Sequence, residues 1–162
     1  MPHKHDPFFP PPGHDHRSCA SEAIAAAETI CQDRGSRLTA LRQRVLEAIW
    51  EGHRPLGAYD ILARLNRNGG RNAPMAVYRA LDFLMDHGLV HRLASRNAFI
   101  GCRHPGDDHS AQFLICDSCG SVAELASDDV HKTIGRAAAK KGFAVTSETV
   151  EITGHCPNCN PS

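Results

Sequence analysis

The stretch Leu89-Val-His-Arg-Leu-Ala-Ser-Arg-Asn-Ala-Phe-Ile-Gly-Cys102 decides how the chain is organised. Two runs of alternating apolar and polar side chains flank a polar centre, a pattern that predicts a β-hairpin. With a turn centred between Arg96 and Asn97, His91 lies directly opposite Cys102. Opposed residues hold their Cβ atoms about 4.5–5.5 Å apart, from where an imidazole and a thiolate can both reach one metal ion. The stretch therefore offers half of a metal site.

The two faces of this hairpin differ in chemistry. His91 and Cys102 share a face with apolar side chains, whereas Arg92 lies on the other face, towards solvent. The alternative is an ordinary core, in which His91 is a hydrogen-bonded histidine and Cys102 a small buried residue. The hairpin alone does not decide between these interpretations, so the flanking sequence is needed.

Charge is distributed unevenly along a chain whose formal net charge is zero. Residues 34–103 hold twelve arginines, no lysine and five acidic residues, whereas residues 1–33 and 104–162 are both acidic on balance. Arginine suits bidentate contact with phosphate and guanine. The basic segment favours nucleic acid as a partner, with a solvated basic surface as the alternative.

Cysteine content and hydropathy indicate the compartment. The chain has seven cysteines, an odd number, and we find no secretory signal in it. No apolar run approaches the roughly 20 residues of a membrane span. We therefore expect a reduced, cytoplasmic protein with no membrane partner.

The N-terminal half predicts a winged helix-turn-helix domain over residues 21–102. The preceding residues 1–20, rich in proline and histidine, predict a disordered tail. Periodicity and capping residues predict helices over 21–34, 40–51, 58–66 and 74–87. The last of them exposes Met75, Tyr78, Arg79 and Asp82. A helix with this exposed face, followed by a hairpin, is typical of a recognition helix and its wing.

The C-terminal part predicts a small α/β domain over residues 111–162, joined by a polar hinge loop at 103–110. Strands are expected at 111–116 and 121–126, a helix from 128 or 129 to 142, and a third strand at 143–153. The helix is expected to bury an apolar stripe made of Val130, Ile134, Ala137 and Ala138. Together the two domains give an α+β chain.

Two Cys-x2-Cys pairs are the most specific motif in the sequence. They are Cys116 with Cys119, and Cys156 with Cys159. Each pair lies in a turn that lets two thiolates approach one tetrahedral Zn²⁺ at about 2.3 Å. Four thiolates leave no open position, so this zinc is expected to be structural. A redox-active pair is the alternative for either motif alone.

A second set of donors remains outside the four cysteines. His91 and Cys102 from the hairpin, His109 from the hinge loop and Glu124 from the following strand supply N, S, N and O ligands. His104 lies in the same loop and competes with His109. A metal ion here couples the two domains. The other histidines, at positions 53, 87, 131 and 155, lack such neighbours and are expected to be surface or capping residues.

Four segments resemble the ferric uptake regulator family, and most closely its zinc uptake regulator branch, over about residues 22–160. They are Ala76-Val-Tyr-Arg-Ala-Leu-Asp-Phe-Leu84, Gly88-Leu-Val-His91, Cys116-Asp-Ser-Cys-Gly120 and His53-Arg-Pro-Leu-Gly-Ala-Tyr-Asp60. The resemblance implies a homodimeric winged-helix repressor of zinc-uptake genes that binds palindromic operator DNA when it is loaded with metal.

Residue by residue, the resemblance implies two Zn²⁺ ions per subunit. It assigns the regulatory ion to His91, Cys102, His109 and Glu124, and the structural ion to the four cysteines. It also places Tyr59, Tyr78 and Arg79 on DNA, and we add Arg71, which precedes the recognition helix, to this set.

Two other functions are alternatives to this one. An iron- or peroxide-responsive regulator of the same family is the alternative function, although the hinge loop lacks a histidine-rich run. A zinc hydrolase or deaminase is disfavoured because the His-x-Glu and Pro-Cys-x-x-Cys signature is missing. No catalysis and no small-molecule substrate are therefore expected.

Overall fold

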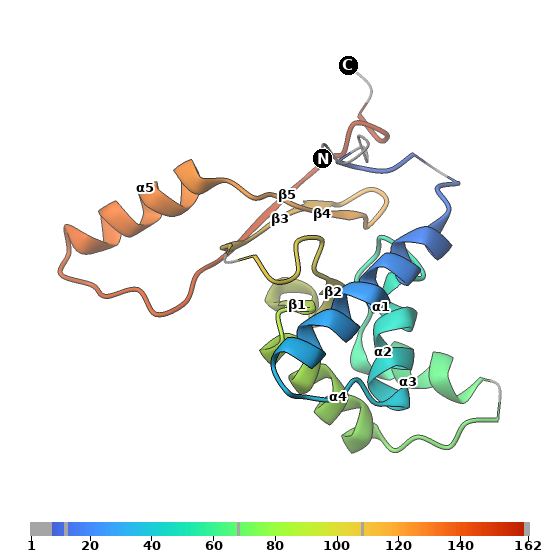
Figure 1. The fold of residues 1–162 in the computed structure, drawn as a ribbon. Helices are drawn as coiled ribbons and strands as arrows, with labels where there is room; N and C mark the ends of the chain where they lie inside the picture. Colours follow the sequence, from blue (N-terminus) through green and yellow to red (C-terminus); the bar gives the residue numbers. More distant parts are fainter. Residues whose placement is uncertain (1–7, 12, 68, 108, 161–162) are drawn as a thin grey trace.

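The computed structural model describes residues 8–160 except 12, 68 and 108. Its N-terminal half is a helical domain followed by a hairpin, and its C-terminal half is a small sheet from which one helix projects (Figure 1). Residues 1–7 and 12 of the predicted tail lie outside the described residues. Among those that are described, no helix combines the length and apolarity needed to cross a membrane.

The first helix, α1 (His16–Asp33), begins five residues before the predicted start, so residues 16–20 are helical instead of part of a tail. Asp15 is the N-cap, and its carboxylate accepts a hydrogen bond from the Arg17 N–H. Ser21, where the predicted helix begins, donates its hydroxyl to the Ser18 carbonyl inside the helix. Asp15 and Ser21 are both residue types that can cap a helix, and the earlier one is used.

The remaining helices of this domain confirm the prediction. They are α2 (Ala40–Trp50), α3 (Ala58–Asn66) and α4 (Pro74–Asp86). Thr39 caps α2 through the Arg42 N–H, and Pro74 opens α4 at the first helical position. Their apolar stripes form one core that includes Val45, Ile61 and Leu81. The residues predicted to be exposed on α4 are exposed, namely Met75, Tyr78, Arg79 and Asp82.

The hairpin consists of β1 (Val90–Leu93) and β2 (Ala98–Gly101), and its predicted register is wrong. His91 lies opposite Ile100, and Leu93 pairs with Ala98. The loop is a 3₁₀ turn closed by Asn97, which adopts a left-handed φ of 45°. This loop is centred one residue earlier than predicted, which shifts the pairing by two residues. Because side chains alternate with period two, the face shared by His91 and Cys102 is unchanged.

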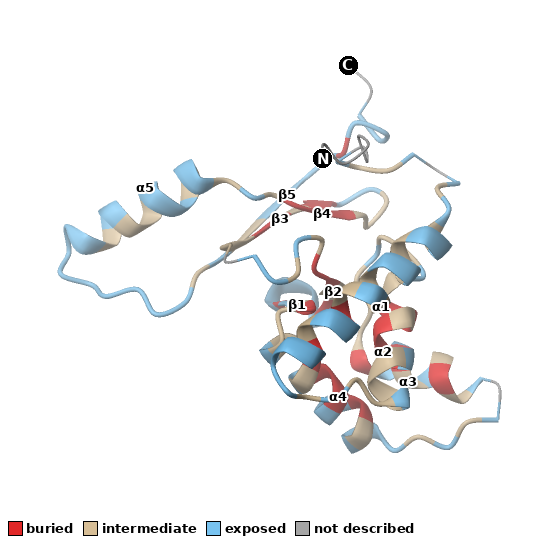
Figure 2. Ribbon diagram, viewed as in Figure 1, coloured by how far each residue is buried: buried red, intermediate tan, exposed pale blue. Residues whose placement is uncertain are grey.

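The hairpin lies between two apolar cores (Figure 2). On one face Val90 and Phe99 pack with the helical core. On the other, Leu93 packs with residues of the C-terminal sheet. The face that carries Arg92 was expected to be exposed to solvent, but Arg92 is the only exposed residue of β1. The wing is therefore held by both domains.

The C-terminal sheet has the strand order β4-β3-β5, with bounds β3 (Ala111–Cys116), β4 (Val122–Glu124) and β5 (Thr149–Gly154). Strand β4 is antiparallel to β3, and β5 is parallel to it. The predicted third strand over 143–153 is present only from Thr149 onwards. The expected apolar alternation fails before that point, and residues 143–148 form no strand.

Helix α5 (Asp128–Ala139) projects from the sheet, and none of its residues is buried (Figures 1 and 2). The predicted inward stripe is therefore wrong for the single chain: Val130, Ile134 and Ala138 are half-buried and Ala137 is exposed. Phe143, which follows the helix, is 67% exposed. An apolar surface that its own chain does not cover indicates an intermolecular interface.

Candidate functional site

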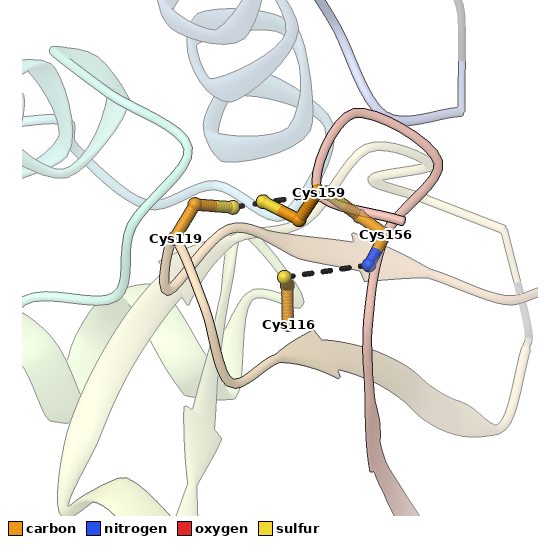
Figure 3. A group of neighbouring side chains, drawn as sticks. All are labelled: Cys116, Cys119, Cys156 and Cys159. Carbon is orange, nitrogen blue, oxygen red and sulfur yellow. Dashed lines mark hydrogen bonds between the residues drawn. The ribbon is translucent and has the colours of Figure 1, made fainter. Parts of the chain in front are cut away.

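The four cysteines of the two Cys-x2-Cys motifs converge at one end of the sheet (Figure 3). Cys116 ends β3 and is paired in register with Gly154 of β5. The parallel pairing brings together the turns that follow each strand, and with them Cys119, Cys156 and Cys159. All four sulfur atoms lie within 4.8 Å of one another.

Their spacing fits a zinc ion. Zn–S bonds of about 2.3 Å at tetrahedral angles hold two sulfur atoms about 3.8 Å apart. The Sγ atoms of Cys119 and Cys156 are 3.8 Å apart (Figure 3). The four residues can therefore hold Zn²⁺ without a large change in their positions.

The local hydrogen bonds divide these thiols into two kinds. The Cys156 N–H donates to Sγ of Cys116 at 3.3 Å, and this bond and the Cys119 N–H lower the pKa of Cys116 to about 6. Hydrogen bonds with Cys156 and Cys119 raise the pKa of Cys159 to about 12. One thiolate is thus ready to bind a cation, while Cys159 has to lose its proton first.

The second donor group brings together the residues predicted for it, with His109 and not His104 as the hinge-loop member. The donor atoms of His91, Cys102, His109 and Glu124 all lie within 4.8 Å of one another. The Cys102 Sγ is 3.5 Å from the His109 Nε2, close to the about 3.5 Å expected for N and S on one tetrahedral zinc. The ring of His104 lies beside that of His109, 6.1 Å away between centroids.

An unpaired nitrogen is the clearest sign that this group fits a cation. The Nε2 of His91 is buried and has no hydrogen-bond partner, although it lies 3.1 Å from the Oε1 of Glu124. The same carboxylate oxygen is 2.5 Å from the His109 Nε2. The Glu124 oxygen therefore forms a hydrogen bond with the His109 nitrogen and leaves the nearby His91 nitrogen without one, so a cation at this point would satisfy a buried polar atom.

The protonation states of this group are set by burial and by neighbouring charge. Burial opposes ionisation of Glu124, but the close contact with His91, the Arg103 N–H and the histidine charges bring its pKa down to about 2. Burial, with the charge of Glu124, raises the pKa of Cys102 to about 12. In the metal-free site the carboxylate is charged and the thiol is neutral, so cation binding has to displace the Cys102 proton.

A second connection between wing and sheet uses no metal ligand. The carboxylate of Glu151, on β5, accepts hydrogen bonds from the N–H groups of Ala94 (2.8 Å) and Ser95 (3.2 Å) in the wing turn. Beside it, Arg96 pairs with Asp117 at 2.9 Å. The sequence motifs did not indicate these tethers, because each joins residues more than 20 positions apart.

The residues predicted to face DNA lie on the outside of the helical domain. Tyr59 at the start of α3 is 70% exposed, and Arg71 and Arg79 are exposed as well. Tyr59 and Tyr78 line one open groove with the wing residues Arg92 and Arg96. The two wing arginines were not included in the predicted DNA-binding set. The alternation of Arg92 with the apolar residues of β1 was the available signal for that residue, whereas Arg96 lies in the turn.

One prediction about the remaining histidines is wrong. His87 caps the end of α4, hydrogen-bonding the Phe83 carbonyl at 2.9 Å, and His131 and His155 are exposed. His53, expected at the surface, instead packs against the rings of His14 and His16. The sequence places these residues far apart, so only the fold reveals their contact.

Comparison with known proteins gives a consistent result. The sequence profile of the ferric uptake regulator family matches residues 33–153. The zinc uptake regulation protein of Escherichia coli K12 is 37% identical to this chain over 145 residues, covering 88% of this chain and 84% of that protein. The ferric uptake regulation protein of Shigella flexneri is 31% identical over 132 residues, covering 79% and 86%.

Two solved structures share the arrangement of most of this chain. A zinc uptake regulator complexed with zinc and DNA has a TM-score of 0.81 at 37% identity, covering 86% of this chain and 94% of that one. Holo XcZur has a TM-score of 0.79 at 42% identity, covering 88% and 99%.

The apo form of XcZur gives a TM-score of only 0.52, at 43% identity and with 86% and 97% covered. Because identity and coverage are nearly equal for its two forms, the lower score reflects conformation, and this chain shares the arrangement of the holo form. The family profile and the zinc and ferric regulators agree over most of the sequence. The chain belongs to the ferric uptake regulator family.

Proposed function

We propose that this protein is a zinc-responsive transcriptional repressor, which binds palindromic operator DNA as a zinc-loaded homodimer and represses zinc-uptake genes. The observation that carries this function is the donor group of His91, Cys102, His109 and Glu124, which spans the wing and the C-terminal sheet. The similarity to zinc uptake regulation proteins supports the same function.

The donor set supports zinc over iron. Two imidazoles, a thiolate and a carboxylate suit tetrahedral Zn²⁺, whereas ferrous iron favours a thiolate less. All four donors are protein side chains, so no position is left for a reacting water molecule. The regulatory role therefore fits this group better than an iron-sensing role or catalysis.

We assign one zinc ion per subunit to each donor group. Cys116, Cys119, Cys156 and Cys159 hold the structural ion, which fixes the turns after β3 and β5 to each other. The other group holds the regulatory ion. When bound there, zinc supplies positive charge that offsets the Glu124 carboxylate and the Cys102 thiolate in a buried site.

The chain's own residues explain how occupancy of the second group is transmitted. His91 and Cys102 belong to the wing, and Glu124 belongs to β4 of the sheet. Holding these residues together fixes the angle between the domains, and so the position of each recognition helix in the dimer. Similarity to the holo form of XcZur, rather than to its apo form, supports such a fixed angle.

Surface left uncovered in the C-terminal half supports the homodimer. Helix α5 buries no side chain in its own chain, and β5 is an edge strand of the sheet. Ile152 on this strand and Phe143 beyond α5 are large apolar residues that face solvent. A second copy of the chain covers these surfaces in our proposal.

The DNA-binding residues lie on the opposite end of the molecule. We assign Tyr78 and Arg79 on α4 to base edges in the major groove, and Arg71 to phosphate. Tyr59 lines the same groove as Tyr78 and extends this surface along α3. In the dimer, the two α4 helices meet successive major-groove turns about 34–36 Å apart.

One titration tests the proposed function. Operator-fragment binding is measured by fluorescence anisotropy at fixed protein concentration as free Zn²⁺ is raised in a metal buffer. We expect zinc to tighten binding at least about tenfold, which corresponds to about 1.4 kcal/mol of coupling. The same titration with Fe²⁺ under anaerobic conditions is the comparison. Equal affinity with zinc and after chelation, or a response to iron alone, contradicts the proposal.

A further inference from the structure

Three imidazoles and a thiol gather where α1 begins, outside both donor groups described above. His14 precedes the helix, and His16 and Cys19 lie three positions apart on it, so they share one face. His53 reaches the same place from the loop after α2. The Nε2 of His14 is 3.0 Å from the Sγ of Cys19.

The three imidazole rings pack against one another. Their centroids lie 5.5 Å apart for His14 and His16, 5.3 Å for His14 and His53, and 4.5 Å for His16 and His53. In the regulatory group the rings of His91 and His109 are 5.6 Å apart. All four members of the N-terminal group are half-buried.

One nitrogen of the group lacks a partner. The Nδ1 of His16 is buried and accepts or donates no hydrogen bond. A buried polar atom in this state is costly unless a ligand satisfies it. The neighbouring Asp15 does not fulfil this role, because its carboxylate caps α1 and pairs with Arg17 at 3.1 Å.

We propose that His14, His16, Cys19 and His53 form a third cation site, which takes a borderline transition-metal ion such as Zn²⁺. Three imidazoles and one thiolate are ligands that this class of ion accepts in tetrahedral geometry. On binding, the rings turn to aim their nitrogens at one point, and the Cys19 thiol releases its proton to solvent.

The position of the site gives it a mechanical consequence. The His53 carbonyl accepts a hydrogen bond from the Val122 N–H at 3.1 Å, at the start of β4. The same strand carries Glu124 of the regulatory group. An ion held by the N-terminal group therefore fastens the start of α1 to a loop that already rests on the C-terminal sheet.

Counting bound ions tests the site. The full chain is saturated with Zn²⁺ alone and desalted, and the retained zinc is measured by mass spectrometry against protein concentration. We expect three ions per subunit in the wild type and two in His16→Asn and in His53→Asn. The matched control His131→Asn removes an exposed imidazole from α5 and should retain three. Two ions in the wild type, or three in both cluster variants, overturn the proposal.

Cobalt provides a second measurement that does not depend on stoichiometry. With Co²⁺ as the probe, the third equivalent bound to the wild type should add a thiolate-to-cobalt absorption band. In Cys19→Ser this increment should be lost, while the bands of the first two equivalents stay. An unchanged increment in Cys19→Ser excludes the thiol from the site and overturns the ligand set. Circular dichroism checks that each variant is folded.

Discussion

Replacing Cys102 by serine separates zinc sensing from folding. The Cys102 side chain is 2% exposed, with its sulfur 3.5 Å from the His109 Nε2 and 4.0 Å from a Glu124 oxygen. Serine has nearly the same shape, and its hydroxyl can donate to the Glu124 carboxylate. The substitution therefore removes a proposed zinc ligand without leaving a cavity or an unsatisfied donor.

The magnitudes follow from these contacts. Because the serine hydroxyl keeps a hydrogen-bond partner, the free energy of unfolding of the metal-free protein should change by no more than about 1 kcal/mol. Zinc-dependent tightening of operator binding, by contrast, should fall from at least about tenfold to less than about twofold. That change removes most of a coupling free energy of about 1.4 kcal/mol.

The assay is the zinc titration of operator binding by fluorescence anisotropy, with thermal unfolding and gel filtration on the same samples. Cys31→Ser is the matched control, because Cys31 is also 2% exposed but belongs to neither donor group. It should lose some stability and keep the full zinc response. If Cys102→Ser responds to zinc like the wild type, the regulatory role of this group is refuted.

Four further results are expected. Arg79→Ala should weaken operator binding by roughly 1–3 kcal/mol and relax the base preference, measured with operator variants. Cys119→Ser should lower the unfolding temperature of the zinc-loaded protein and reduce, but not abolish, the rise in unfolding temperature that zinc produces, because it removes a proposed ligand of the structural ion while the other donor group stays intact. Isothermal titration in buffers of different ionisation enthalpy should detect one proton released for each Zn²⁺ ion bound at the regulatory group. Because the pKa of Cys102 is about 12, the affinity of this group for Zn²⁺ should rise about tenfold per pH unit around neutrality. Glu151→Ala should weaken the binding of operator DNA by the zinc-loaded protein about fivefold, or about 1 kcal/mol, because two N–H groups of the wing turn lose their acceptor.

Much of the helical domain was predictable because its signals are local. Thr39 caps the start of α2, and Pro74 begins α4 with its fixed φ. Gly88 follows the end of α4 with a positive φ, and all three lie at the predicted helix boundaries. The start of α1 was missed because Asp15 and Ser21 are both good caps. Choosing between them depends on contacts made by the first turn of the helix, which sequence periodicity does not include.

The candidate metal groups were predictable for a different reason. Two cysteines separated by two residues must lie in one tight turn, so their thiols are close together. Side chains alternate between the two faces of a hairpin, so His91 and Cys102 stay on the same face when the register shifts by an even number of residues. The exact register was not predictable, since it depends on the left-handed conformation of Asn97 in a four-residue loop. The error of two residues in the register therefore did not change which residues form the donor group.

Contacts between distant segments account for what the sequence did not indicate. The predicted stripe on α5 exists, but its own chain does not cover it, and single-chain patterns do not distinguish an intramolecular core from a dimer interface. The tether at Glu151 and the packing of His53 against His16 likewise join residues with no shared periodicity. The packing of His53 against His16 lies within the helical domain, whereas the Glu151 tether depends on how the two domains meet.

The way they meet explains why a small ion can control a DNA-binding protein. The hairpin contributes Phe99 to the helical core and Leu93 to the core under the sheet, so it cannot move with respect to one domain without straining the other. A side chain on Gly101 would come within 2.3 Å of the Trp50 ring, which shows how closely the wing fits against α2. When zinc binding fixes His91 of the wing, we therefore expect the wing and the helical domain to move together as one rigid body. Disorder of the wing alone on zinc removal, with the domain angle unchanged in small-angle scattering, would contradict this rigid-body coupling.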